Sequence, residues 1–321
     1  LAFLMAHDSD SFNRWEAAQD LSTRVLLERL GRPPEARLSQ SELGLVGAFR
    51  KVLSEPTLDG SIKALTLRLP SEELLAQALE PVDPDAIHQA RRSLTRELAA
   101  ALRDELTETY MHNRLGGDAV EKAEVDRRRI KNCALRYLVS LEEPDTVALA
   151  AAQFDEATGM TDYEAAFASL VDIDGPETER AIDAFHERAA GEPLVLDKWF
   201  RMQAMASSPT VFERVVALSR HPDFNLANPN RARSLLYAFA AGNPLGFHRK
   251  DGAAYRFVGE KIVELDAINP QVAARIVASF NQWKRYEPAR SALMKAELER
   301  IGSHSRISKD VSEIVERALQ G

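Results

Sequence analysis

The histidines of this chain are the residues whose spacing would most directly indicate hydrolytic chemistry. A helical zinc-peptidase site needs two histidines at positions i and i+4, so that both imidazoles leave one face of the helix, with a glutamate beside the first as general base. His186 is followed by Glu187, but the partner position holds Ala190. None of the seven histidines lies within four residues of another histidine, a cysteine or a convincing carboxylate set. The sequence therefore predicts no metal ligand and no catalytic residue here, unless distant side chains meet in space.

Other catalytic arrangements are also missing from the sequence. There is no G-x-S-x-G nucleophile elbow, no G-x-x-x-x-G-K phosphate loop and no G-x-G-x-x-G fingerprint. Cys133 is the single cysteine and shares an apolar helical pattern with Leu135 and Leu138. We interpret it as a buried small hydrophobic residue rather than a nucleophile. A lone cysteine cannot form an internal disulfide, which suits a reducing compartment and predicts a cytoplasmic location.

Composition excludes several partner classes. The 321 residues are 45% hydrophobic and 28% charged, which is ordinary for a globular protein. A net charge of −8 argues against a general nucleic-acid binder. The sequence has no run of about 18 apolar residues, so we expect no membrane partner. The first residue is Leu1 rather than Met, which fits either a segment of a longer polypeptide or a processed chain.

Helical patterns dominate, and period-2 runs of Val, Ile and aromatic residues are nearly absent. Several expected helix starts pair a capping residue with a following Pro, whose missing N–H is not needed in the first turn. Such pairs begin at Asn228, Asn269, Ser208 and Glu287. The patterns predict helices over residues 10–30, 40–53, 71–79, 83–113, 118–140, 145–156, 161–172, 176–190, 193–206, 209–219, 229–241, 251–266, 270–282, 287–301 and 308–319, with a possible break in 83–113.

The order of these helices predicts an all-α fold. Short connections favour antiparallel neighbours. The later helix pairs recur roughly every 30 to 45 residues without a repeated consensus word, which is typical of an irregular HEAT/armadillo-like helical solenoid, a superhelix of antiparallel helix pairs. An irregular helical bundle is the alternative. No low-complexity linker divides the chain, so we expect a single domain over residues 1–321.

The segment from Asn228 to Tyr286 is the most specific part of the sequence. It reads NPNRARSLLYAFAAGNPLGFHRKDGAAYRFVGEKIVELDAINPQVAARIVASFNQWKRY and holds three Asn-Pro dipeptides. Shorter matching words are FNRWEAAQ from residue 12, GMTD from residue 159 and DKWF from residue 197. On these residues, and over essentially its whole length, the chain resembles the C-terminal helical region of the bacterial aminopeptidase N family. These are zinc metallopeptidases of the gluzincin aminopeptidase class.

The resemblance implies a non-catalytic part of a larger enzyme. Members of the family remove N-terminal amino acids from peptides, with a zinc site built on the helical H-E-x-x-H motif that this chain lacks. It implies that the zinc belongs to an upstream catalytic domain of the same polypeptide, and that this segment holds no cofactor and is inactive alone. The segment would wall the substrate chamber and gate access to the active site. Its partners would be that catalytic domain and short peptide substrates.

Helical spacing aligns Arg233 with Tyr237, and it sets Gln271 and Arg275 on a polar stripe opposite the apolar stripe of Val272 and Ile276. The candidates for the substrate channel or the domain interface are therefore Arg231, Arg233, Arg275, Gln271 and Tyr237. For the three arginines, the resemblance implies this role. Arg275 matches a family arginine that faces the chamber, and Arg231 and Arg233 belong to the matching Asn-Pro-Asn-Arg block. A guanidinium suits a peptide carboxylate because it offers a planar fork of donors. The alternative interpretation is that these arginines form ion pairs with acids on neighbouring helices.

Two other functions remain open on the sequence. The chain could be a free-standing helical-repeat scaffold that binds a protein partner on its concave face; the mass of the native gene product separates this from a piece of a larger enzyme. It could also be an independent hydrolase whose site is assembled from distant residues, which metal and activity assays would reveal.

Overall fold

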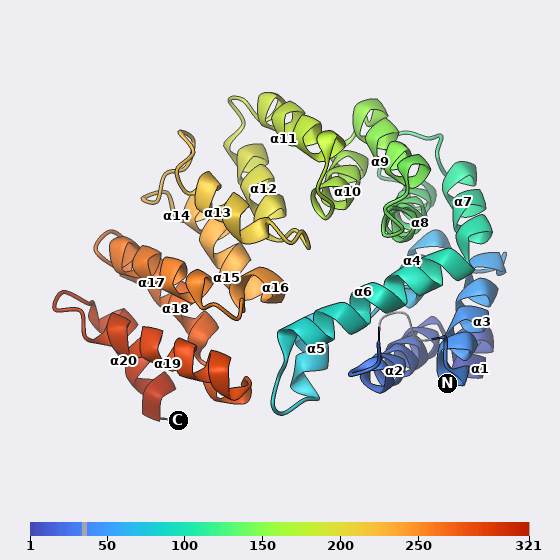
Figure 1. Cartoon of the computed structure of the whole chain (residues 1–321). Helices are drawn as coiled ribbons and strands as arrows, with labels where there is room; N and C mark the ends of the chain where they lie inside the picture. Colours follow the sequence, from blue (N-terminus) through green and yellow to red (C-terminus); the bar gives the residue numbers. More distant parts are fainter. Residues whose placement is uncertain (34–36, 321) are drawn as a thin grey trace. The chain divides into compact units, whose positions relative to one another are not determined.

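The computed structural model describes residues 1–33 and 37–320, and these residues are helical without any strand (Figure 1). The predicted all-α class is confirmed. No helix in the described ranges is both long and apolar enough to cross a membrane. The chain divides into two compact units, one made of residues 1–77 and 85–170, the other of residues 78–84 and 171–321. We predicted a single domain over residues 1–321. Whether the two units form one domain depends on how they join, so this stays a prediction.

The first unit is an array of packed helices. Within it α8 contacts α4, α7 and α9, while α1 contacts α2 and α3. The helices are α1 (Ala2–His7), α2 (Ser11–Arg29), α3 (Gln40–Ser54), α4 (Gly60–Thr66), α5 (Glu72–Gln77), α6 (Pro84–Ala101), α7 (Arg103–His112), α8 (Lys122–Val139), α9 (Pro144–Glu156) and α10 (Met160–Val171). The first residue of α6 and the last of α10 fall in the second unit.

Aromatic pairs join the helices of the first unit. Phe154 of α9 stacks on Tyr163 of α10, with ring centroids 4.3 Å apart. Tyr137 of α8 meets the edge of Phe49 of α3 and donates its hydroxyl hydrogen to the carbonyl oxygen of Leu67 at 2.6 Å. Such a pair adds about 0.5–1.5 kcal/mol beyond the burial of its area. Phe49 and Tyr137 thus join α3 and α8, which are distant along the chain.

The second unit contains the remaining helices, and it carries all five candidate residues. They are α11 (Pro176–Arg188), α12 (Pro193–Ala204), α13 (Val211–Leu218), α14 (Pro229–Ala232), the π-helix η1 (Arg233–Tyr237), α15 (Ala238–Gly242), α16 (Pro244–Phe247), α17 (Ala253–Asp266), α18 (Pro270–Val277), the 3₁₀ turns η2 (Ala278–Phe280) and η3 (Trp283–Arg285), α19 (Pro288–Gly302) and α20 (Lys309–Gln320).

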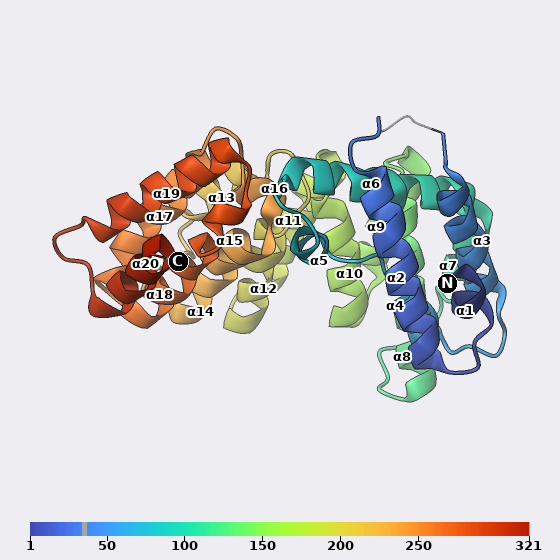
Figure 2. The same ribbon diagram turned by 90° about the horizontal axis from the view of Figure 1, so that it is seen from below.

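These helices form two rows within the second unit. In one row, α12 contacts α14 and η1, η1 contacts α18, and α18 contacts α20. In the other row, α16 contacts α13 and α17, and α17 contacts α19. Figure 2 shows α18 and α20 on one side, with α17 and α19 on the other. Pairs such as α17 with α18 and α19 with α20 join the rows, as expected for stacked helix pairs.

The Asn-Pro signals mark helix starts as predicted. The side-chain oxygen of Asn228 accepts hydrogen bonds from the backbone N–H groups of Asn230 and Arg231, and that of Asn269 accepts from Val272 at 3.2 Å. Glu287 also caps its helix through its carboxylate. Ser208 differs, because α13 begins at Val211 and the Ser208 hydroxyl instead accepts from the N–H of Thr210 in the preceding turn.

Several boundaries differ from the sequence prediction. The expected helix over 229–241 is interrupted by the π-turn η1. The possible break in 83–113 occurs at Leu102, between α6 and α7, as the sequence allowed. The short helices α1, α4 and α16 lie outside the predicted set. Each has only four to seven residues, too few for a full hydrophobic period to be recognised.

Candidate functional site

Four of the five candidate residues present exposed side chains on two elements that touch each other. Arg233 and Tyr237 lie on η1, and Gln271 and Arg275 lie on α18. The two elements pack together in the same row of the second unit. We call these four residues the exposed quartet. Their donors remain accessible, which a contact with substrate or with another domain requires.

Arg233 and Tyr237 lie at the two ends of the π-turn η1, and both are exposed. A π-helix places one extra residue in its turn, and such turns occur frequently at functional sites. Between them, the adjacent Leu235 and Leu236 are both buried. Residues four positions apart share a face in a regular helix as well, so this separation of polar and apolar side chains fits the helical spacing of the sequence.

Helix α18 separates its polar and apolar faces more simply. Val272 and Ile276 are buried, while Gln271 and Arg275 are exposed at matching helical spacing. The Asn269 cap and Pro270 fix where this helix starts, and therefore which way each face points. This division of faces is the one that the sequence pattern predicted.

The fifth candidate, Arg231, is buried. Its Nε donates to the Asp197 carboxylate of α12 at 2.7 Å, and its Nη1 donates to the backbone carbonyl of Asp223. Its guanidinium carbon lies 4.9 Å from the centroid of the Phe200 ring. For this residue the structure matches the alternative interpretation, in which an arginine pairs with an acid on a neighbouring helix. Arg231 holds α12 and the segment before α14 in place.

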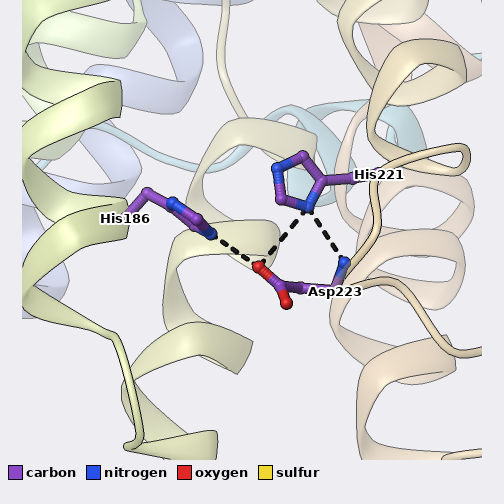
Figure 3. Close-up of side chains that lie close together, drawn as sticks. All are labelled: His186, His221 and Asp223. Atoms are coloured by element: carbon purple, nitrogen blue, oxygen red, sulfur yellow. Dashed lines mark hydrogen bonds and ion pairs between the residues drawn. The ribbon is translucent and has the colours of Figure 1, made fainter.

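A second group of polar side chains lies next to this arginine. His186, at the end of α11, and His221 and Asp223, in the segment that follows α13, point toward one another (Figure 3). We call them the His–Asp cluster. His186 Nε2 lies 2.7 Å from Asp223 Oδ2, and His221 Nδ1 lies 3.7 Å from the same oxygen. The backbone N–H of Asp223 donates to His221 Nδ1 at 3.2 Å.

The surroundings of the His–Asp cluster shift the pKa values of two members. Partial burial lowers the pKa of His221 below its usual range, and the neighbouring His186 lowers it further. The hydrogen bond with His186 lowers the pKa of Asp223. Asp223 is thus a carboxylate at neutral pH, and His221 is shifted toward its neutral form, which carries a free lone pair.

Trp199 of α12 forms the inner wall of the cluster. It is 3% exposed, and its ring centroid lies 4.9 Å from that of His186 and 5.3 Å from that of His221. Its indole N–H donates to the carbonyl oxygen of Ile182 at 2.9 Å. The cluster therefore has one apolar side fixed by α12 and one side open to solvent.

Local spacing in the sequence could not reveal this cluster. His186 and Asp223 are separated by 37 positions, and only the packing of α11 beside the α13–α14 segment joins them. The one local signal is the word His221-Pro222-Asp223, which sets an imidazole and a carboxylate two positions apart. The case left open by the sequence, distant side chains that meet in space, is realised here.

Cys133 does not offer a nucleophile. Burial raises the pKa of its thiol to about 12, so the thiolate is scarce at neutral pH. Its Sγ is 4.0 Å from the carbonyl oxygen of Ala64, on the neighbouring helix α4. Cys133 as a whole is half-buried rather than buried, so its interpretation as a buried hydrophobic residue stays a prediction.

Comparison with known proteins places this geometry in context. A family model described as "Domain of unknown function (DUF3458_C) ARM repeats" matches residues 1–320, which confirms the predicted repeat architecture. Aminopeptidase N of Caulobacter vibrioides is 38% identical over 317 residues, which are 98% of this chain and 36% of the relative. Aminopeptidase N of Escherichia coli K12 is 36% identical over 319 residues, which are 99% of this chain and 37% of the relative.

A solved structure gives the same correspondence. The crystal structure of Legionella pneumophila aminopeptidase A in complex with aspartic acid matches 99% of this chain and 38% of its own, with a TM-score of 0.89 and 29% identity. The chain spans only 36–37% of the length of the two curated relatives described above. These matches confirm the resemblance to the C-terminal region of aminopeptidase N that the short sequence motifs indicated.

Proposed function

The chain belongs to the DUF3458_C family of ARM-repeat domains, and from this premise we propose that it is the C-terminal helical domain of a zinc aminopeptidase of the aminopeptidase N type. One observation carries the proposal. Nearly all of the chain aligns with proteins named aminopeptidase N, while most of the length of those proteins lies outside the match. The parent enzyme removes N-terminal amino acids from peptides, in the cytoplasm.

Catalysis in such a parent belongs to residues outside this chain. When bound in the catalytic domain, a zinc ion would supply Lewis-acid chemistry toward the scissile carbonyl and the attacking water, with a glutamate of that domain as base. The helical domain walls the substrate chamber and gates access to it. It admits short peptides and excludes folded proteins by their size. Its partners are the catalytic domain of the same polypeptide and the peptide itself.

The exposed quartet gives this wall its chemistry. Arg233 and Arg275 offer guanidinium donors to the downstream carbonyls or the terminal carboxylate of a peptide, or to the catalytic domain. Gln271 adds an amide, and Tyr237 adds an aromatic face with a hydroxyl. Arg231 acts differently, as a positioning residue, because Asp197 and the Asp223 carbonyl already hold its guanidinium.

Arginine substitutions in the natural polypeptide test the channel role. We expect Arg233→Ala and Arg275→Ala to weaken the cleavage of peptides of several residues and to spare a single aminoacyl-anilide, which is too short to reach this domain. Loss of a charge-assisted hydrogen bond costs about 1.5–3 kcal/mol, or roughly 10- to 150-fold in kcat/KM. Steady-state kinetics with both substrates measure the difference.

Arg256→Ala on α17 is the matched control, because its side chain is 63% exposed and the same charge is removed. It should leave both substrates unaffected. Equal losses on the peptide and the anilide, or no loss on either, would remove the arginines from a channel role. The intact mass of the native product tests domain membership separately, since a mass of 35.7 kDa would favour the free-standing scaffold.

A further inference from the structure

We propose that His186, His221 and Asp223 bind a divalent transition-metal ion of the zinc type, which joins α11 to the segment that follows α13. Two imidazole nitrogens and one carboxylate oxygen make a donor set that suits zinc and its first-row neighbours. Calcium and magnesium prefer oxygen donors alone, so the two imidazoles disfavour them. Water would complete the coordination on the open side.

The distances fit a single small ion. The three donor atoms lie within 4.8 Å of one another. Donor atoms that bind a tetrahedral zinc ion at 2.0–2.2 Å lie about 3.3–3.6 Å apart, so side-chain rotations must draw the most distant donors closer by about 1 Å. All three side chains are partly exposed and therefore free to make these adjustments: His186 is 35%, His221 29% and Asp223 44% exposed.

Bringing in the ion changes two hydrogen bonds. His186 Nε2 and Asp223 Oδ2, 2.7 Å apart, share a proton that the metal replaces. His221 Nδ1 gives up the N–H of Asp223, which donates to it at 3.2 Å. The lost bonds are a partly exposed ion pair and a long hydrogen bond, each of modest strength.

The neighbours of the cluster hold its frame. Trp199 supplies an apolar wall, and an apolar shell limits the access of competing water. Arg231 fixes the backbone of Asp223 by donating to its carbonyl oxygen. The positive charge of Arg231 is balanced by Asp197 at 2.7 Å, so the carboxylate of Asp223 remains available to neutralise the ion.

This assignment departs from the expectation, drawn from local spacing, that the segment holds no metal. That expectation considered each histidine within its own stretch of chain, whereas the fold brings together two stretches. The site depends only on these three side chains, whatever reaction the parent performs. Because the ligands come from two elements, a bound ion would act as a cross-link and raise the melting temperature.

Zinc titration of the natural polypeptide and of a double variant tests the site. Both are stripped with a chelator and titrated with Zn²⁺ by calorimetry; the difference between them cancels any zinc bound elsewhere. We expect the unsubstituted polypeptide to bind one more equivalent of zinc than the His186→Ala/His221→Ala variant. Loss of a supporting group costs about 10- to 100-fold in metal affinity, so the removal of a ligand should weaken this extra equivalent by at least about 100-fold. Cobalt substitution should give additional visible d–d absorption in the unsubstituted polypeptide, above that of the double variant.

Two further variants keep the test decisive. His112→Ala removes an exposed histidine of α7 that lies outside the group and should keep the extra equivalent. Asp223→Asn preserves shape and should weaken zinc binding even if the double variant fails to fold. Equal zinc stoichiometry and affinity in the parent and in either ligand variant, with helical circular dichroism retained, would overturn the proposal.

Discussion

Two histidine environments in the second unit make an instructive pair. His248 is 5% exposed, its Nδ1 lies 2.8 Å from the Tyr255 hydroxyl, and its ring stacks on Tyr286. The histidines of the His–Asp cluster are partly exposed and face a carboxylate. Both environments share one device. An arginine donates to a backbone carbonyl, Arg290 to that of His248 and Arg231 to that of Asp223.

The difference between the two environments lies in what surrounds the imidazole. Burial lowers the pKa of His248 to about 3, and the nearby Arg290 contributes in the same direction. That ring is neutral over the whole physiological range and serves packing. In the cluster, Asp223 attracts positive charge and solvent reaches the rings. The same side chain is thus a core element in one place and a potential ligand in the other, because of burial and the sign of the neighbouring charge.

The largest effect should come from removing the buried arginines. Arg290 is fully buried, donates to the His248 carbonyl and pairs with Glu287 at 3.0 Å. Breaking such a buried pair costs about 3–5 kcal/mol. We expect Arg290→Ala to lower the free energy of unfolding by this amount, and Arg231→Ala by somewhat less because its surroundings are more open. Urea denaturation measures both free energies of unfolding. A loss below about 1 kcal/mol for Arg290→Ala would show that the buried arginine does not stabilise the surroundings of His248.

A smaller effect should appear as pH dependence. The pKa of His248 is about 3 in the folded chain and about 6.5 in the unfolded chain, so the unfolded state binds the extra proton between these values. Stability is therefore retained above pH 6.5 and falls as the pH drops toward 3. Between pH 6.5 and 4.5, the free energy of unfolding of the unsubstituted chain should fall by about 2 kcal/mol more than that of the His248→Gln variant. Parallel stability curves for the two chains, measured by urea denaturation, would count against a neutral buried ring.

The smallest effect is expected at Asp223 in the presence of a chelator. Its ion pair with His186 is partly exposed, and such pairs contribute about 0–1 kcal/mol. Asp223→Asn should therefore change the free energy of unfolding by less than about 1 kcal/mol without metal. A loss of several kcal/mol would mean that the cluster stabilises the fold without metal, as the buried environment of His248 does.

Features encoded in a few neighbouring residues were predictable from the sequence. Asn228 and Asn269, each followed by Pro, mark the starts of α14 and α18 because a cap bonds to the backbone two or three residues further on. The polar face of α18, with Gln271 and Arg275, followed from helical spacing. Helix α4 was missed although Asp59 caps it, since only seven residues follow the cap.

Features created by contacts between distant segments were not predictable. Arg231 was a candidate for substrate contact because it belongs to the Asn-Pro-Asn-Arg block that matches the family. Its ion-pair partner Asp197 lies 34 positions earlier, so local sequence could not show that the guanidinium is already paired. The His–Asp cluster depends on how α11 packs beside the α13–α14 segment, which no local spacing encodes. The π-turn η1 was also invisible, because the apolar pattern of residues 229–241 fits an ordinary helix about as well.

The π-turn η1 makes one place of the chain tolerant of a change in length. A π-turn holds one residue more than a regular turn, so removing one residue between Arg233 and Tyr237 would leave a regular helix whose later residues keep their faces. Phe239, fully buried in α15, would stay in the interior. A deletion inside a regular helix such as α17 would instead rotate every later residue of that helix by about 100° about its axis.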